Sequence, residues 1–397
     1  MSLFKRSGPT HKRVLVIDIG SSSTATSLVD ISASTKDGMH KPTVLASFRN
    51  AFVIENEVRY EELVDLIRKS LFASLGNIID SKIGSPSEIY VVLNAPWYAS
   101  QTRTISFKKT TPFVINEKLV NELSEKEIKL FKDSHLQEYG GDSPQMVEKT
   151  VQGITLNGYV IHNPFGKKTQ ELSLSLFLSI APSHMMEMIH ETIEKTFHLS
   201  KVHFSTFAAG AMSTLNEAFI SETDYLVVNV GNEVSEVSLV KNSFLARTLT
   251  FPSGSHSMFR SMRDGGHMLN FDEARTKFNL WYSGHAHEVL NATMDPLMDT
   301  ISTSWLSQFQ SAMIQFSGSL SLPNTVFLVA ESQDLASWYK EVLAKSDLHQ
   351  YTMTTDAFNV IVISTEALHE LVHYQDGVVR DPIMMTEVSF ISRVISL

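Results

Sequence analysis

The chain has 397 residues, of which 43% are hydrophobic and 19% charged, so it can bury a large core and is expected to divide into two or more domains. Its formal net charge of −10 argues against a generic nucleic-acid binder, and its lack of cysteine excludes a disulfide scaffold and a thiolate metal site. The sequence contains neither a signal-like N-terminus nor an apolar run of roughly 18 residues that could form a transmembrane segment. We therefore expect a cytoplasmic protein.

The first 13 residues carry Lys5, Arg6, Lys12 and Arg13 and no acidic residue. We expect a basic flexible tail over residues 1–13, because termini of this kind are rarely ordered. The alternative is a weak electrostatic attraction of this segment to an anionic membrane.

Residues 14–19 form an apolar run, interrupted only by Asp18, that predicts a buried strand. A tight turn into a second strand follows, and it consists of Gly20, Ser21, Ser22 and Ser23. Backbone N–H groups and hydroxyls in such a turn can bind phosphate, and a carboxylate at the end of the strand can hold a hydrated metal ion. An ordinary β-hairpin is the alternative interpretation of so short a pattern.

The following segment, up to residue 97, has the order typical of an α/β sheet with a helix on one face. Its predicted elements are a strand at 43–48, an amphipathic helix at 59–79 and a buried strand at 88–94.

Residues 98–201 differ in character and predict a small α+β unit inserted into the first domain. Its predicted elements are an edge strand at 102–107, a helix at 116–131 capped by Asn116, strands at 146–156 and 171–181, and a helix at 183–197. The polar stretch 133–144 predicts a mobile loop. Because three strands are too few for a large pocket, we expect this unit to present a docking surface.

The second half repeats the order of the first: an apolar strand that ends in glycine at 224–231, two further strands and a helix from 254. The later predicted elements are helices at 272–281, 285–316 and 334–343, strands at 325–330 and 358–363, and a terminal helix after Asp381-Pro382.

Three stretches in this order resemble the bacterial FtsA and PilM proteins of the actin-like ATPase superfamily. They are the first turn at 16–23, the Asn-Pro-Phe-Gly turn at 163–166 with its flanking strands, and the second strand at 224–231 with Asp272-Glu273-Ala274-x-x-Lys277. The resemblance implies an α/β, actin-like (ribonuclease H-like, duplicated) two-domain fold. Its implied parts are domain I at 14–97 and 202–222, the inserted subdomain at 98–201, and domain II at 223–397.

The resemblance also implies a site for ATP and Mg²⁺, with Asp18 at the metal. The other residues implied to bind the nucleotide are Gly20, Ser21, Ser22, Ser23, Asn229, Gly231, Asn232, Glu273 and Lys277. The second loop departs from the family pattern, because Asn229 stands where the family has an aspartate and the side chains of Asn232 and Glu233 crowd the loop. A degenerate site is therefore expected, with ATP binding left open and hydrolysis not expected.

Two functions remain open at this stage. The first is an FtsA/PilM-like scaffold at the inner face of the cell membrane, in cell division or type IV pilus assembly, with a membrane-bound or filament-forming protein docked on residues 98–201 and self-association as an option. Because residues 383–397 lack the basic face of a membrane anchor, recruitment by a partner is favoured. The alternative is an active actin-like ATPase or a sugar-kinase-related phosphotransferase.

One further pattern, His369-Glu370-x-x-His373, has the zincin spacing and would bind Zn²⁺ if it lay on a helix. No third ligand is evident nearby, so we expect a chance match.

Overall fold

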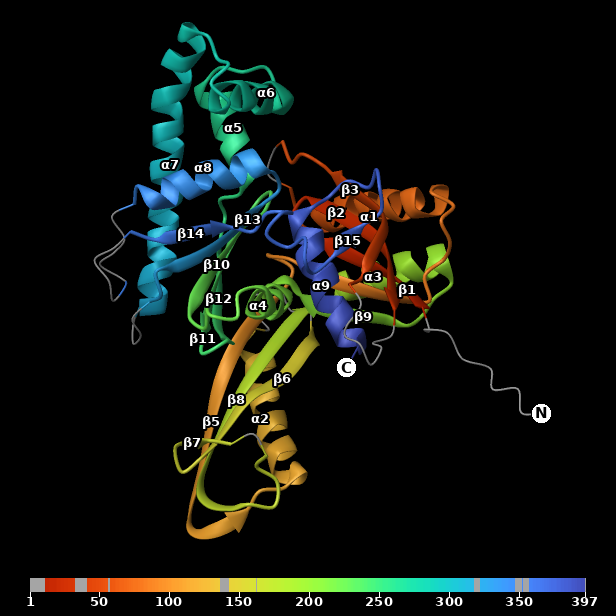
Figure 1. Ribbon diagram of the computed structural model, residues 1–397, viewed down its shortest axis with the longest axis vertical. Coiled ribbons are helices and arrows are strands. Elements are labelled where there is room, and N and C mark those ends of the chain that lie inside the picture. The colour runs from red at the N-terminus through yellow and green to blue at the C-terminus, as the bar shows by residue number, and fades with distance from the viewer. Residues whose placement is uncertain are drawn as a thin grey trace, which may run out of the picture.

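The computed structural model describes residues 11–32, 41–55, 58–135, 143–161, 163–317, 322–346, 352 and 357–396. Two β-sheets form its centre, one of six strands and one of nine. Helices cover both sheets, and an elongated arm projects from the place where they meet (Figure 1).

The six-stranded sheet has the order β15-β3-β2-β1-β4-β9. Its strands are β1 (His11–Ile19), β2 (Ser23–Ser32), β3 (Thr43–Ala51), β4 (Glu88–Leu93), β9 (Val202–Thr206) and β15 (His373–Tyr374). β1 pairs antiparallel with β2 and parallel with β4, which places Asp18 opposite Val92. The carboxyl ends of β1 and β4 therefore meet at one edge of the sheet.

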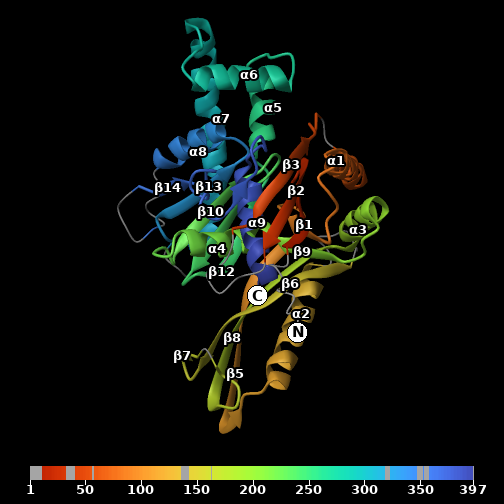
Figure 2. The same cartoon turned by 45° about the vertical axis from the view of Figure 1, so that its right-hand side comes forward.

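Four helices pack against this sheet. They are α1 (Tyr60–Asp80), α3 (Ser183–Phe197), α4 (Phe207–Ala218) and α9 (Pro382–Ser396). Figure 2 shows α1 and α3 on one side of β1, β2 and β3 and α9 on the other. The buried faces of all four contribute to one apolar core, with Leu71, Ile189, Ala211 and Val388 among its members. α3 lies in the predicted insertion but packs with this core, because Met185 and Ile189 form its apolar stripe.

The nine-stranded sheet has the order β14-β13-β10-β11-β12-β5-β8-β6-β7. The strands of its first part are β10 (Tyr225–Val230), β11 (Ser235–Lys241), β12 (Phe244–Phe251), β13 (Thr325–Ala330) and β14 (Asn359–Val362). Its helices are α5 (Ser255–Gly265), α6 (Phe271–Tyr282), α7 (Glu288–Ser317) and α8 (Gln333–Ala344). β10 and β11 are antiparallel, while β10 and β13 are parallel, so this half repeats the β1, β2, β4 arrangement.

The remaining strands of this sheet form the arm. They are β5 (Ala99–Val114), β6 (Pro144–Leu156), β7 (Tyr159–Val160) and β8 (Lys168–Pro182), and α2 (Glu117–His135) packs on them. β12 meets β5 only at Gln101, which lies opposite Arg247. The residues predicted as an edge strand, 102–107, pair with β8 and not with β12, so the pairing agrees with that prediction.

The two ends of the chain differ from the predicted boundaries. β1 begins at His11, and Lys12 and Arg13 form ion pairs with Glu88 and Asp30, so these residues belong to the sheet and not to a tail. Residues 1–10 lie outside the described part, as do residues 136–142 of the predicted mobile loop.

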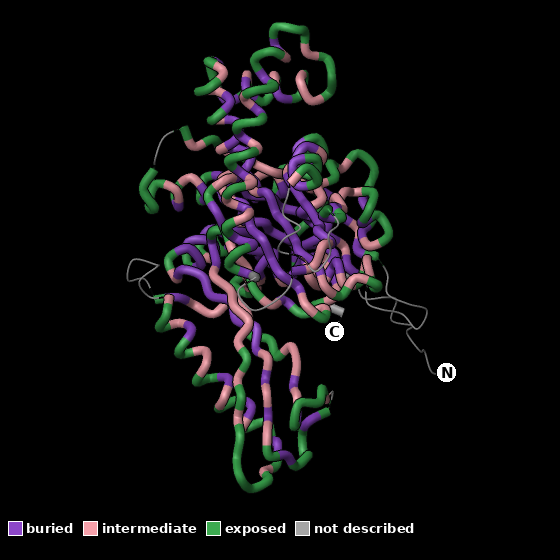
Figure 3. Tube along the Cα trace, turned by 90° about the vertical axis from the view of Figure 1, so that its left-hand side faces the viewer, coloured by how far each residue is buried: buried purple, intermediate pink, exposed green. Residues whose placement is uncertain are grey.

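At the other end, β15 pairs with β3 and α9 packs against β1, β2 and α4. Residues 223–397 therefore do not pack as one unit: the C-terminal part returns to the first sheet. Figure 3 shows buried residues concentrated in the two sheets, while the arm is mainly intermediate and exposed.

Candidate functional site

The turn between β1 and β2 meets the turn between β10 and β11 directly. The backbone N–H of Glu233 donates to Ser21 Oγ over 2.9 Å, and Ser23 Oγ donates to Asn232 Oδ1 over 3.2 Å. Ser22 Oγ lies 3.1 Å from His256 Nδ1, on the helix that follows β12. The two turns that the sequence singles out are thus joined by side chains of the protein itself.

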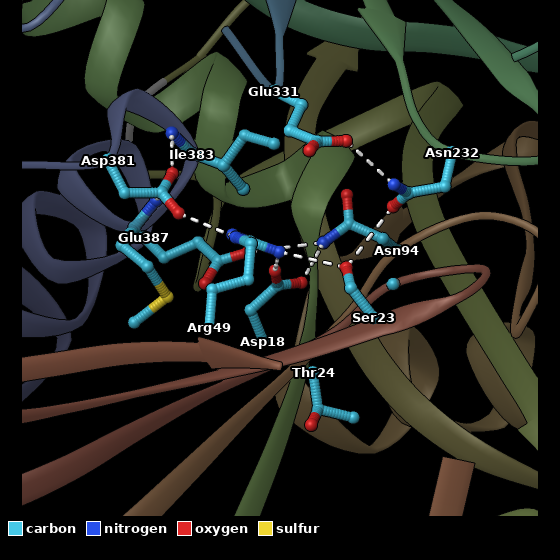
Figure 4. Close-up of polar contacts among 12 residues, drawn as sticks. Asp18, Ser23, Thr24, Arg49, Asn94, Asn232, Glu331, Asp381, Ile383 and Glu387 are labelled. Carbon is cyan, nitrogen blue, oxygen red and sulfur yellow. Dashed lines mark hydrogen bonds and ion pairs between the residues drawn. The ribbon is translucent and has the colours of Figure 1, made fainter. Parts of the chain in front are cut away.

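Arg49, near the end of β3, lies beside these turns. Its Nη1 is 2.7 Å from Asp18 Oδ2 and donates to Ser23 Oγ over 3.1 Å, while its Nε donates to Asp381 Oδ2 over 2.7 Å. Figure 4 shows the guanidinium between the two aspartates, with the carboxyl group of Glu387 next to it. A cationic side chain therefore occupies the position beside Asp18.

Two asparagines continue the polar network across the junction, by which we mean the place where the β1–β2 turn meets the β10–β11 turn. Asn94 Nδ2 donates to Asp18 Oδ1 over 2.6 Å and is 3.2 Å from Glu387 Oε1, and Asn94 Oδ1 accepts from Asn229 Nδ2 over 2.8 Å. Both oxygens of Asp18 are therefore engaged by protein groups. A metal ion beside Asp18 would have to displace the guanidinium of Arg49 or share these oxygens with it.

The carboxyl groups of this network outnumber its single guanidinium. Burial raises the pKa of Asp18, an effect that the charge of Arg49 opposes. Burial, reinforced by the charge of Asp18, raises the pKa of Glu387 well above its ordinary value. Burial therefore favours the protonated form of Glu387, while Arg49 pairs with the carboxyl groups of Asp18 and Asp381.

The carboxylate of Glu233 is paired with cationic and hydrogen-bonding side chains, so it presents no unpaired charge to the turns. Arg260 donates to both of its carboxylate oxygens, over 3.0 and 2.5 Å, and His256 Nδ1 lies 3.4 Å from Oε1. Burial opposes the charged form of Glu233, but these hydrogen bonds and the charge of Arg260 lower its pKa overall. Asn232 is held in a similar way, since its Nδ2 donates to Glu331 Oε2 over 2.8 Å.

The space that remains between the turns is a cavity of about 20 Å³. Its lining includes Asp18, Gly20, Ser21, Ser23, Asn229, Gly231 and Asn232, all of which the sequence predicts as site residues. A cavity needs on the order of 10–15 Å³ to hold one water molecule, so this one has room for a water but not for a nucleotide. The residues in their present positions therefore do not fit ATP with Mg²⁺.

The other predicted site residues lie outside this cavity lining. Ser22 is bonded to His256, as described above, while Glu273 and Lys277 form an ion pair with each other at 2.8 Å on α6. Glu273 also accepts a hydrogen bond from the backbone N–H of Leu269. These two side chains stabilise the start of α6 in this structure.

His369 and Glu370 do not lie on an α-helix, and His373 is the first residue of β15. Within the described ranges, no group of three or more His, Asp or Glu side chains is placed to hold a metal ion. The helix on which this pattern would bind Zn²⁺ is therefore not formed in this structure.

Neither a protein-family model nor a curated protein matches the chain by sequence. Among solved structures, a PilM-PilN type IV pilus biogenesis complex matches over 97% of this chain and 98% of that chain, with 12% identity and a TM-score of 0.57. A MamK double helical filament matches over 97% and 99%, with 10% identity and a TM-score of 0.46. The ethanolamine utilization protein EutJ from Carboxydothermus hydrogenoformans matches over 96% and 89%, with 12% identity and a TM-score of 0.41.

The chain has the actin-like ATPase fold. The β1-β2 hairpin of its first half matches the β10-β11 hairpin of its second half, and the cavity lies between the turns of these two hairpins. The predicted fold class is confirmed.

Sequence reasoning missed much of the polar network at the junction of the two turns. The missed residues are Arg49, Asn94, His256, Glu331, Asp381 (expected only as a helix cap) and Glu387. Their contacts join residues up to 332 positions apart, as in the Arg49–Asp381 pair, and no local periodicity reports such a distance. The one available signal was an arginine at the end of a strand next to the Asp18 hairpin.

Proposed function

We propose that this chain is an FtsA/PilM-like actin-fold scaffold at the inner face of the cell membrane, in cell division or type IV pilus assembly, with a degenerate ATP site. The observation that carries the proposal is Arg49, whose guanidinium binds Asp18 and Asp381 between the two turns. All three residues belong to the first half of the molecule, so a cation of the protein itself occupies the place beside Asp18, while the bonds between the halves are those of the two turns.

Admitting a nucleotide requires breaking the hydrogen bonds that join the two halves, such as Ser23–Asn232 and Asn94–Asn229. It also requires moving Arg49 away from Asp18 and Asp381, and each charge-assisted bond of this kind contributes roughly 1.5–3 kcal/mol. The carboxylates of Asp381 and Glu331 would then face the phosphates of the nucleotide, which disfavours their approach. Closure without a ligand suits a scaffold, because the relative position of its two halves does not depend on turnover.

The membrane role rests on the likeness to the PilM-PilN complex and on the arm. By analogy with that complex, we propose that a membrane-bound or filament-forming protein docks on residues 98–201 and that self-association is a further option. In the part of the chain that the structure describes, no helix is long and apolar enough to cross a membrane. α9 is buried against β1, β2 and α4, so it does not serve as a membrane anchor in this conformation.

A calorimetric titration with MgATP tests the nucleotide part of the proposal. We expect no saturable heat in the micromolar range for the wild-type protein. Gly20→Arg serves as the blocked variant, since a Cβ at Gly20 already lies 3.0 Å from Ser23 Oγ, and Gly153→Arg is the matched control, because nothing lies within 4 Å of a Cβ there. Micromolar binding that Gly20→Arg removes and Gly153→Arg retains would favour the alternative, an active ATPase or phosphotransferase.

A further inference from the structure

The end of the arm that points away from both sheets carries exposed apolar side chains. We define the arm tip as residues 105–118, 154–161 and 163–171, at the far ends of β5, β6 and β8 and including β7 (Figure 1). Tyr159 is 75% exposed, Val160 70% and Phe165 47%, and Val114 is exposed beside them. The first two follow the tight Asn157-Gly158 turn, where both residues have positive φ. These side chains therefore lie on the turns that close the arm.

The same turns are basic, although the chain as a whole is acidic. The arm tip has five lysines and two glutamates, whereas the whole chain has a net charge of −10. Lys108 pairs with Glu171 at 2.8 Å, and Lys118 approaches Glu122 at 3.9 Å. For Lys109, Lys167 and Lys168 no ion pair is found with any described residue; Lys109 lies over the rings of Phe107 and Phe113. Several positive charges are thus unneutralised next to the apolar side chains.

We infer that the arm tip is a docking surface for an anionic lipid bilayer. Exposed Tyr, Val and Phe side chains on turns can enter the boundary between headgroups and acyl chains, while neighbouring lysines reach the lipid phosphates. The inference deepens the proposed function and rests on it only in taking the protein to act at a membrane. It adds a direct contact with lipid to the recruitment by a protein partner.

The length of the arm removes the main objection, which is repulsion between an acidic protein and an anionic membrane. β5 has 16 residues and β8 has 15. At about 3.3 Å per residue, such strands span roughly 50 Å. The Debye length at physiological ionic strength is about 8 Å, so the charges of the two sheets and their helices are screened at that distance while the lysines of the tip are not.

The test is co-sedimentation of the full-length protein with two kinds of vesicle, phosphatidylcholine alone and phosphatidylcholine with about one third phosphatidylglycerol. We expect binding to the anionic vesicles only, with loss at high salt. Two tip variants, Lys167→Glu/Lys168→Glu and Tyr159→Ser/Phe165→Ser, should each bind the anionic vesicles with an affinity reduced about ten-fold or more. All four side chains are exposed, so both variants should keep the wild-type melting temperature.

Two matched controls keep the test specific. Lys5→Glu/Arg6→Glu reverses two charges near the N-terminus. Leu269→Ser/Val289→Ser removes two highly exposed apolar side chains, one just before α6 and one in the first turn of α7, and α6 lies at the opposite end of the molecule from the arm (Figure 1). Both controls should bind anionic vesicles as the wild type does.

Absence of wild-type binding at low salt would overturn the inference and leave the arm tip to an acidic protein partner. Equal binding of the tip variants and the wild type would also overturn it, because the contact would then lie elsewhere. Neither result bears on nucleotide binding, so the inference and the MgATP test fail separately.

Discussion

Replacing Arg49 by methionine removes the guanidinium beside Asp18 and keeps a side chain of similar length. The buried carboxyl group of Asp18 and the partly buried one of Asp381 then lose their cation. Breaking a buried ion pair in this way costs roughly 3–5 kcal/mol, in line with the loss of two charge-assisted hydrogen bonds. The effect should be large because Asp18 is only 1% exposed and cannot regain its solvation without opening the junction.

The assay is differential scanning calorimetry of wild type and Arg49→Met. For a domain of 150–250 residues, 1 kcal/mol shifts the melting temperature by roughly 2–4 °C, so the first unfolding transition should fall by about 6 °C or more. The control is Arg59→Met, which breaks an exposed pair with Glu62 on α1 and should leave the transition nearly unchanged. Adding Asp18→Asn to Arg49→Met should recover part of the loss, because it removes one unpaired charge.

The pH dependence supplies a second check on the same variant. Without Arg49, protonation relieves the repulsion between the carboxyl groups of Asp18 and Asp381, so the difference from wild type should shrink as the pH falls. If Arg49→Met and Arg59→Met melt together at neutral pH, the guanidinium does not stabilise this pair of carboxyl groups and the reasoning fails.

Two further variants test other parts of the account. Burial raises the pKa of Glu236 to about 7 from 4.5, so folding gains from its protonation below pH 4.5 and loses that gain as the pH rises through 7. Glu236→Gln can still accept a hydrogen bond from Tyr98 but cannot ionise. Relative to wild type, its free energy of unfolding should therefore rise by about 3 kcal/mol as the pH rises from 4.5 to 7. Urea unfolding at several pH values measures this difference, and parallel pH profiles of the two proteins would contradict the assignment. Gly254→Ala places a Cβ 2.3–2.5 Å from backbone atoms of the second turn and should cost about 1–3 kcal/mol, whereas Gly153→Ala should be tolerated; equal melting temperatures would show that the turn yields freely.

Much of the fold follows from local pattern. The helix predicted at 183–197 has those bounds in the structure, and Asp381 caps α9 by accepting from the backbone N–H groups of Ile383 and Met384. Such elements follow from apolar periodicity and capping chemistry, which depend only on neighbouring residues. The order of the elements, together with the resemblance to the FtsA and PilM proteins, predicted the fold class.

The failures concern which distant segments meet. β15 has two residues, too few to show a periodicity, and its pairing with β3 depends on the return of the C-terminal part of the chain to the first sheet. The meeting of the first residues of β5 with β12 joins segments nearly 150 positions apart, as in the Ser100–Thr248 hydrogen bond, and no local pattern predicts it.

The candidate site was predicted in the same partial way. The two turns could be read from the sequence, and seven of the predicted residues line the cavity. The side chain that fills the place beside Asp18 could not, since Arg49 reaches it from the third strand of a sheet whose register is fixed only in the fold.

Hydrogen exchange of the ligand-free protein tests the central claim most directly. The N–H groups of Gly20, Gly231 and Glu233 are all bonded within or between the two turns, to Ser23 O, Val234 O and Ser21 Oγ. If the protein closes its own junction, these amides exchange slowly without nucleotide, and adding MgATP leaves their rates unchanged. Rapid exchange that MgATP slows would show an open junction that a nucleotide closes, and would contradict the account.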